Sequence, residues 1–219
     1  MSVRISNSNE TILEDTRVSL TNVEEQTEIA AVMSEYGYGS EELLPGKALL
    51  DLANQAYSNS RREAYEESEA YAAFATCRGE LEATYAVFRK KAKVVFRNDQ
   101  LTLDLLGVSG DTPRAYVSWL NSVRNCCKLA LGSETILAGM GRLNCSSEDF
   151  QACLDKCDNL DVLRAAYLRE KGESQNATKT KDAAFVELDK WMRDFYAVAK
   201  IALEDQPQLL ESLGVVVKS

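Results

Sequence analysis

Apolar residues recur at the three-to-four-residue spacing of an amphipathic helix through the first part of the chain. The clearest run covers residues 10–35, which we predict to be helical. Its apolar positions are Ile12, Val18, Val23, Ile29, Ala30 and Met33. The next segment, YGYGSEELLPG at residues 36–46, combines three glycines with a proline. This composition predicts a turn between two helices.

A much longer pattern follows at residues 47–97 and predicts one long helix. Residues seven positions apart form two mostly apolar series, which is typical of a heptad seam. The two series are Leu50, Tyr57, Ala64, Tyr71, Arg78, Tyr85 and Ala92, and Ala53, Ser60, Glu67, Phe74, Leu81, Phe88 and Val95. A helix of this length would extend roughly 75 Å. We therefore expect an elongated molecule or assembly.

The chain also matches itself at a constant offset of 107 positions, without a gap. This register places Leu81 over Leu188 and Gly107 over Gly214, and roughly 20 of about 108 pairs are identical. We expect Gly107 and Gly214 each to end a short amphipathic helix, as a C′ glycine does. Coincidence between amphipathic helices would not keep one register through turns. We therefore predict two tandem helical-hairpin repeats, repeat 1 at residues 1–108 and repeat 2 at residues 109–219.

Repeat 2 differs from repeat 1 in the middle of its long helix. Residues 169–182, REKGESQNATKTKD, are polar on all sides and include Gly172. The gapless duplication favours a continuous, solvated helix here, whereas the composition favours a break into a loop. Both alternatives stay open from the sequence.

Together these patterns predict an all-α fold, an elongated antiparallel bundle with a pseudo-two-fold axis, packed as one domain. The first helix of each repeat is about half as long as the second, so part of each long helix must pack on the other repeat or on another chain. Exposed seam positions would favour aggregation. We therefore expect self-association, as a homodimer or a larger assembly.

The charge balance narrows the classes of partner. The net charge is −9, and an acidic surface repels phosphate backbones, so we expect no nucleic acid partner. One basic cluster departs from this balance: Arg89, Lys90, Lys91, Lys93 and Arg97. We interpret it as the solvated face of a helix, with an anionic-ligand patch as the alternative.

The sequence contains no apolar run long enough to span a membrane, and its first residues lack the apolar core of a signal peptide. We therefore expect no membrane span and a cytoplasmic location. In that compartment the six cysteines would be reduced thiols.

Signatures of catalysis are absent from the sequence. There is no histidine, which removes the commonest general base and metal ligand, and no glycine-rich phosphate loop. Cys153 and Cys157 lie four positions apart and, with Cys145, could bind a soft metal. Their spacing is not that of a zinc knuckle, so small buried thiols are favoured. We predict no catalytic residue, no cofactor and no metal site.

Two tyrosines in the predicted turn, Tyr36 and Tyr38, are expected to be exposed, because glycines flank them. Tyrosine is enriched at interfaces, so they are the main candidates for a protein contact. The expected function is that of a non-enzymatic structural or protein–protein interaction protein. One alternative is a bundle that binds a small molecule or a metal, with Ser60, Glu67 and Arg78 facing inward. Another is an adaptor that binds anionic surfaces through residues 89–97.

Overall fold

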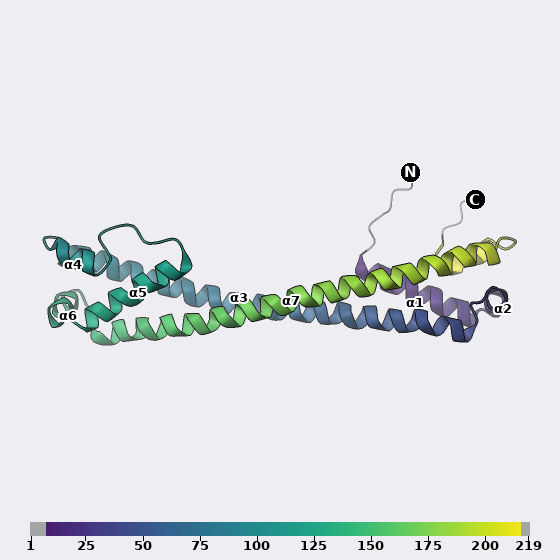
Figure 1. Cartoon of the computed structure of the whole chain (residues 1–219), viewed down its shortest axis with the longest axis horizontal. Helices are drawn as coiled ribbons and strands as arrows, with labels where there is room; N and C mark the ends of the chain where they lie inside the picture. The colour runs from purple at the N-terminus through teal and green to yellow at the C-terminus, as the bar shows by residue number, and fades with distance from the viewer. Residues whose placement is uncertain (1–7, 216–219) are drawn as a thin grey trace. The chain divides into compact units, whose positions relative to one another are not determined.

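The computed structural model describes residues 8–215, and every regular element within them is an α-helix. This confirms the all-α prediction. Figure 1 shows the helices in chain order, α1 (Asn9–Glu25), α2 (Thr27–Glu35), α3 (Ser40–Val95), α4 (Gln100–Leu105), α5 (Tyr116–Leu131), α6 (Glu134–Gly141), α7 (Ser147–Ala202) and α8 (Gln208–Ser212). None of these helices has an apolar stretch suited to crossing a membrane.

The chain divides into two compact units. Unit 2 is the continuous segment Glu66–Lys171, and unit 1 joins Met1–Tyr65 to Gly172–Ser219. The long helices α3 and α7 each contribute one half to each unit. Each unit therefore contains helices from both halves of the sequence.

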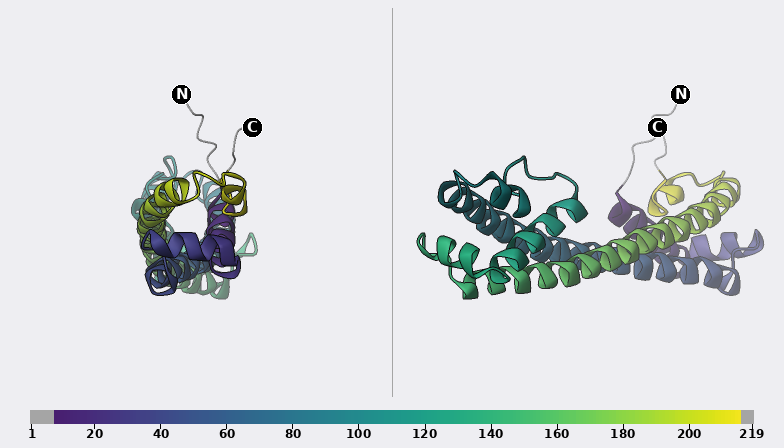
Figure 2. Two further views of the ribbon diagram at one scale, coloured as in Figure 1. Left: turned by 90° about the vertical axis from the view of Figure 1, so that its right-hand side faces the viewer. Right: turned by 60° about the vertical axis from the view of Figure 1, so that its left-hand side comes forward.

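Unit 1 packs α1 and α2 against the first half of α3 and the second half of α7 (Figure 2, left). Its core includes Leu20, Ile29 and Phe195, all nearly inaccessible to solvent. Ser19 connects α1 to the segment after α8, because its Oγ lies 2.8 Å from the Leu213 carbonyl oxygen.

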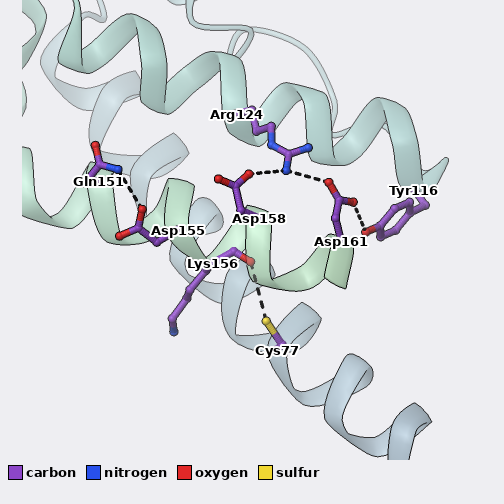
Figure 3. Close-up of polar contacts among 8 residues, drawn as sticks. All are labelled: Cys77, Tyr116, Arg124, Gln151, Asp155, Lys156, Asp158 and Asp161. Atoms are coloured by element: carbon purple, nitrogen blue, oxygen red, sulfur yellow. Dashed lines mark hydrogen bonds and ion pairs between the residues drawn. The ribbon is translucent and has the colours of Figure 1, made fainter. Parts of the chain in front are cut away.

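Unit 2 packs α5 and α6 against the second half of α3 and the first half of α7 (Figure 1). Phe88 on α3 and Phe150 on α7 lie at its centre, with ring centroids 4.6 Å apart. Arg124 on α5 makes ion pairs with two α7 carboxylates, Asp158 at 2.7 Å and Asp161 at 2.8 Å (Figure 3). The apolar core and these ion pairs together hold α5 on α7.

Two predicted boundaries near the N-terminus are wrong. The helix predicted at residues 10–35 is interrupted at Gln26, whose backbone is extended. Of the turn predicted at 36–46, only residues 36–39 lie outside the helices, because α3 already begins at Ser40 and includes Pro45. Tertiary packing explains the early start: Leu43 is buried, and Gly46 faces the ring of Trp191 so closely that a Cβ would lie 2.7 Å from Cζ2.

The polar segment 169–182 is helical throughout, as part of α7. Two small residues on one face, Ser174 and Ala177, are buried there, and neither carries the bulk that would prevent close packing. Gly172 has open space around it. Of the two alternatives left open by the sequence, continuity of the helix is the one observed.

The heptad series on α3 is only partly right. Leu50 and Ala92 are buried as predicted, but Tyr71 is exposed, and Cys77 is buried in place of Arg78. The buried positions of α3 therefore do not keep a strict seven-residue spacing, and they shift by one residue near the middle of the helix.

The helix bounds follow the offset found in the sequence. Shifting α3 by 107 positions gives the bounds of α7, and both helices have 56 residues. α1 and α2 begin 107 positions before α5 and α6. The tandem duplication and the boundary at residues 108 and 109 stay predictions, and the two compact units do not coincide with the two repeats.

Candidate functional site

A pocket of about 620 Å³ opens in unit 2 between α3, the segment that precedes α5, and α5 itself. Its lining residues come from positions far apart in the sequence: Arg78, Glu82, Tyr85, Ala86, Arg89, Lys90, Lys93, Thr112, Pro113, Arg114 and Trp119. Five of them are basic and one is acidic. On a chain with a net charge of −9, this is a local concentration of positive charge.

Arg89 forms the inner wall of the pocket and is only 9% exposed. Its guanidinium donates hydrogen bonds to the carbonyl oxygens of Gly107 at 3.1 Å, Val108 at 3.3 Å and Gly110. Gly107 ends α4 with a positive φ of 67°, as its predicted role at a helix C-terminus requires. Arg89 therefore fixes the chain that leaves α4, and the interpretation as a solvated residue is wrong for it.

The other basic residues of the pocket are more accessible. Lys90, Lys93 and Arg114 are exposed, and their side chains make no hydrogen bond or ion pair with any residue in the described range 8–215. Arg78 pairs with Glu82 at 2.9 Å and lies 5.5 Å from the ring centroid of Trp119. The single acid of the pocket is therefore already paired, while three cations remain available.

The basic cluster predicted from the sequence is thus divided by the fold. Arg89, Lys90 and Lys93 line the pocket, whereas Lys91 donates to the carbonyl oxygen of Asn144 at 3.1 Å. Arg97 lies exposed in the turn after α3. Sequence reasoning named Arg78 as a candidate ligand-binding residue but missed Arg114 and Trp119, because their proximity to Arg78 depends on how α5 packs against α3.

An exposed apolar stripe runs beside the pocket on α3. Val87 is 45% exposed and Val94 is 61% exposed, and they lie one heptad apart with Lys90 between them on the same face. Ala83, one turn earlier, is exposed as well. Neither valine belongs to the core of unit 2. We call Ala83, Val87, Lys90 and Val94 the α3 stripe.

The tyrosine turn is only partly available for contact. Tyr36 is exposed, as expected. Tyr38 is not: its ring packs edge-on against Trp191 at 5.8 Å and Phe195 at 5.4 Å. Burial accordingly raises the pKa of Tyr38. The expectation that both tyrosines are exposed is therefore wrong for Tyr38, and a contact role for Tyr36 stays a prediction.

All six cysteines are free and buried, as predicted for small core thiols. Burial raises the pKa of Cys126 to about 12. The pKa of Cys153 is also raised to about 12, chiefly through its hydrogen bond with Cys127. These thiols are poor nucleophiles near neutral pH, because the thiolate is the reactive form.

Figure 3 shows polar contacts that link helices within unit 2. Besides Arg124 and its two aspartates, the Tyr116 hydroxyl donates to Asp161 at 3.2 Å. Lys156 of α7 makes a second link, because its Nζ pairs with Glu80 on α3 at 2.8 Å. These contacts join α7 to the two helices, α3 and α5, that form the pocket.

The pocket can hold an anion by charge and an apolar group by contact with its aromatic and proline side chains. Comparison with known proteins gives no match: no family model, no curated protein and no solved structure corresponds to this chain.

Proposed function

We propose that this chain is a non-enzymatic, cytoplasmic interaction protein that binds an acidic amphipathic helix of a protein partner on its α3 stripe. One observation carries the proposal: Val87 and Val94 are exposed at heptad spacing, with the cation of Lys90 between them. This arrangement matches the pattern by which amphipathic helices pair. The six cysteines are all free, with no disulfide among them, which supports the cytoplasmic location.

The charge of the stripe determines which partner fits. Lys90, Lys93 and Arg97 are all exposed at this end of α3. A second copy of the chain docked on the same face would bring two sets of these cations together, and like charges in an interface cost affinity. An acidic partner is therefore favoured here over the homodimer expected from the sequence.

The valines supply most of the expected affinity of the stripe. Each keeps about half of its side chain accessible, and covering that area contributes about 1 kcal/mol per valine. Losing both should therefore weaken binding by about 2 kcal/mol, or roughly 30-fold.

The test uses two designed helical peptides with the same leucine face, one with glutamates and one with lysines at the flanking positions. Fluorescence anisotropy should show binding of the acidic peptide but not of the basic one, and added salt should weaken that binding. Val87→Ser combined with Val94→Ser should reduce that binding roughly 30-fold. Ile201→Ser is the matched control, because Ile201 lies 107 positions after Val94 and is 60% exposed on α7.

Three results would contradict the proposal. Equal binding of both peptides would exclude a role for charge. The absence of binding by the acidic peptide would show that the α3 stripe is not a binding site for such a helix. A dimer in light scattering that the Val87→Ser, Val94→Ser variant abolishes would identify a second copy as the occupant.

A further inference from the structure

We propose that the unit 2 pocket is a binding site for a phosphate monoester with a small aromatic or apolar body. This site is distinct from the α3 stripe: Lys90 belongs to both, and Lys93 lines the pocket while also adding charge beside the stripe. The inference rests on three observations: a buried arginine without a carboxylate partner, three available cations at the pocket mouth, and an equivalent pocket in unit 1 that lacks this charge.

The buried arginine is the first observation. Among the described residues the partners of Arg89 are three carbonyl oxygens and the Tyr85 hydroxyl, at 3.5 Å, and none is a carboxylate. A buried charge without a counter-ion is costly. Carbonyl dipoles hold the guanidinium in place but leave its full positive charge at the pocket wall. An anion in the pocket would neutralise it.

The available cations are the second observation. Lys90, Lys93 and Arg114 line the same cavity and have no partner within residues 8–215. Glu82, which would oppose an anion, is held by Arg78 at 2.9 Å. With five basic residues against one acid, the pocket is better matched to a doubly charged group than to a single carboxylate. Arginine and lysine are the usual ligands of phosphate.

The unit 1 pocket serves as an internal comparison. It measures about 530 Å³ and occupies the corresponding place, because Asp189, Tyr196, Ala197 and Lys200 lie 107 positions after Glu82, Arg89, Lys90 and Lys93. The inner arginine is replaced there by tyrosine and one lysine by alanine.

The charges of the unit 1 pocket also cancel. Its described lining holds two acids, Asp15 and Asp189, and two bases, Arg193 and Lys200. Asp189 and Arg193 pair with each other. Helix packing alone therefore produces the cavity, and the excess of positive charge is specific to unit 2.

The size and walls of the unit 2 pocket indicate the rest of the ligand. A cavity of about 620 Å³ lies within the usual range for organic ligands and exceeds what a bare phosphate fills. Pro113, Trp119 and Tyr85 supply its apolar walls. We therefore expect a ligand whose phosphate meets Lys93 and Arg114 while its body lies against these side chains.

The test is isothermal titration of the full-length chain with AMP, adenosine and inorganic phosphate. AMP should bind saturably, adenosine at least tenfold more weakly, and inorganic phosphate more weakly than AMP. Trp119 provides a local reporter, because the chain has two tryptophans and Trp191→Phe leaves Trp119 alone. Its fluorescence should change with AMP.

The variant pair tests where AMP binds. Lys93→Gln with Arg114→Gln should lower the affinity at least tenfold, since both side chains are exposed and their loss leaves the core intact. Lys200→Gln removes the equivalent lysine of unit 1 and should leave the affinity within twofold. Val87→Ser with Val94→Ser should also leave it unchanged, which separates this site from the α3 stripe.

A lipid headgroup presents the same chemistry, so vesicles containing phosphatidic acid form a second arm. The phosphate would be assigned to a lipid if the chain sediments with these vesicles but not with phosphatidylcholine vesicles, and if Lys93→Gln with Arg114→Gln abolishes that sedimentation. AMP binding without sedimentation would assign it to a soluble ester. Any of three results would overturn the proposal. These are the absence of saturable binding in both arms, adenosine binding as tightly as AMP, and a loss of AMP affinity in Lys200→Gln equal to that in Lys93→Gln with Arg114→Gln.

Discussion

Gly46 is the position where one added methyl group has the most direct structural consequence. It lies inside α3, and a Cβ there would be 2.5 Å from Cζ3 and 2.7 Å from Cζ2 of Trp191. The ring cannot move freely, because it stacks on Phe195 at 5.6 Å and meets Tyr38 at 5.8 Å. We predict that Gly46→Ala destabilises unit 1 even though alanine is the better helix former.

The magnitude follows from two opposing terms. Replacing glycine by alanine inside a helix stabilises it by about 1 kcal/mol. Overpacking a rigid aromatic core costs about 3 kcal/mol, the upper end of the usual range. The net loss is then about 2 kcal/mol, and with an m-value of about 2 kcal/mol/M the urea midpoint should fall by about 1 M.

The control is Gly172→Ala, on α7 in the same unit, where no atom lies within 4 Å of the added Cβ. It should raise stability by about 1 kcal/mol. Urea unfolding followed by Trp191 fluorescence in a Trp119→Phe background reports unit 1 alone, because Trp119 belongs to unit 2.

A third variant identifies the cause of the loss. Trp191→Phe removes the outer ring atoms that the new methyl group would meet, so Gly46→Ala should be neutral or stabilising in that background, as followed by circular dichroism. If Gly46→Ala is as stabilising as Gly172→Ala in the original chain, the packing assigned to Trp191 is incorrect.

Three further predictions concern unit 2. Arg124→Gln should lower the free energy of unfolding by about 1 kcal/mol, less at high salt, because its two ion pairs are partly solvated; a salt-independent loss would contradict this. Burial and the charge of Asp161 raise the pKa of Tyr116 to about 12, so Asp161→Asn should lower that pKa in an ultraviolet titration, and no shift would exclude the contact. Cys126 and Cys153 have a folded pKa of about 12 against an ordinary 9.0, so their stabilising effect should be complete below pH 9.0 and decrease as pH rises toward 12. Ellman's reagent near pH 8 should therefore react slowly with the native chain and fast after unfolding; fast labelling of native chain would refute the burial of these thiols.

Much of the helix content could be predicted from the sequence, because helix formation depends on residues three and four positions apart. The long helices and the glycines after α4 and α8 follow from such local patterns. Gly107 and Gly214 both adopt the positive φ that this role requires. The buried state of the cysteines was also predictable, since small apolar thiols fit a core.

The boundaries were less predictable where local and tertiary preferences disagree. Pro45 and Gly46 indicated a turn, yet both lie within α3, because Leu43 and Trp191 pack there. The exposed role expected for Tyr38 failed for a related reason: its ring fills the space beside Trp191 and Phe195. Residues of α7, more than a hundred positions away, decide the environment of this turn.

The candidate site shows the same division between sequence and tertiary structure. The sequence by itself determined that a basic cluster lies near the end of a long helix, because charge and helical spacing are local properties. Only the tertiary structure decided that Arg89 turns inward to the carbonyl oxygens after α4, that Lys91 bonds to Asn144, and that Lys90 and Lys93 face a cavity. The physical reason is that a pocket is made by packing: Arg114 and Trp119 reach α3 only when α5 buries its apolar face in the core of unit 2.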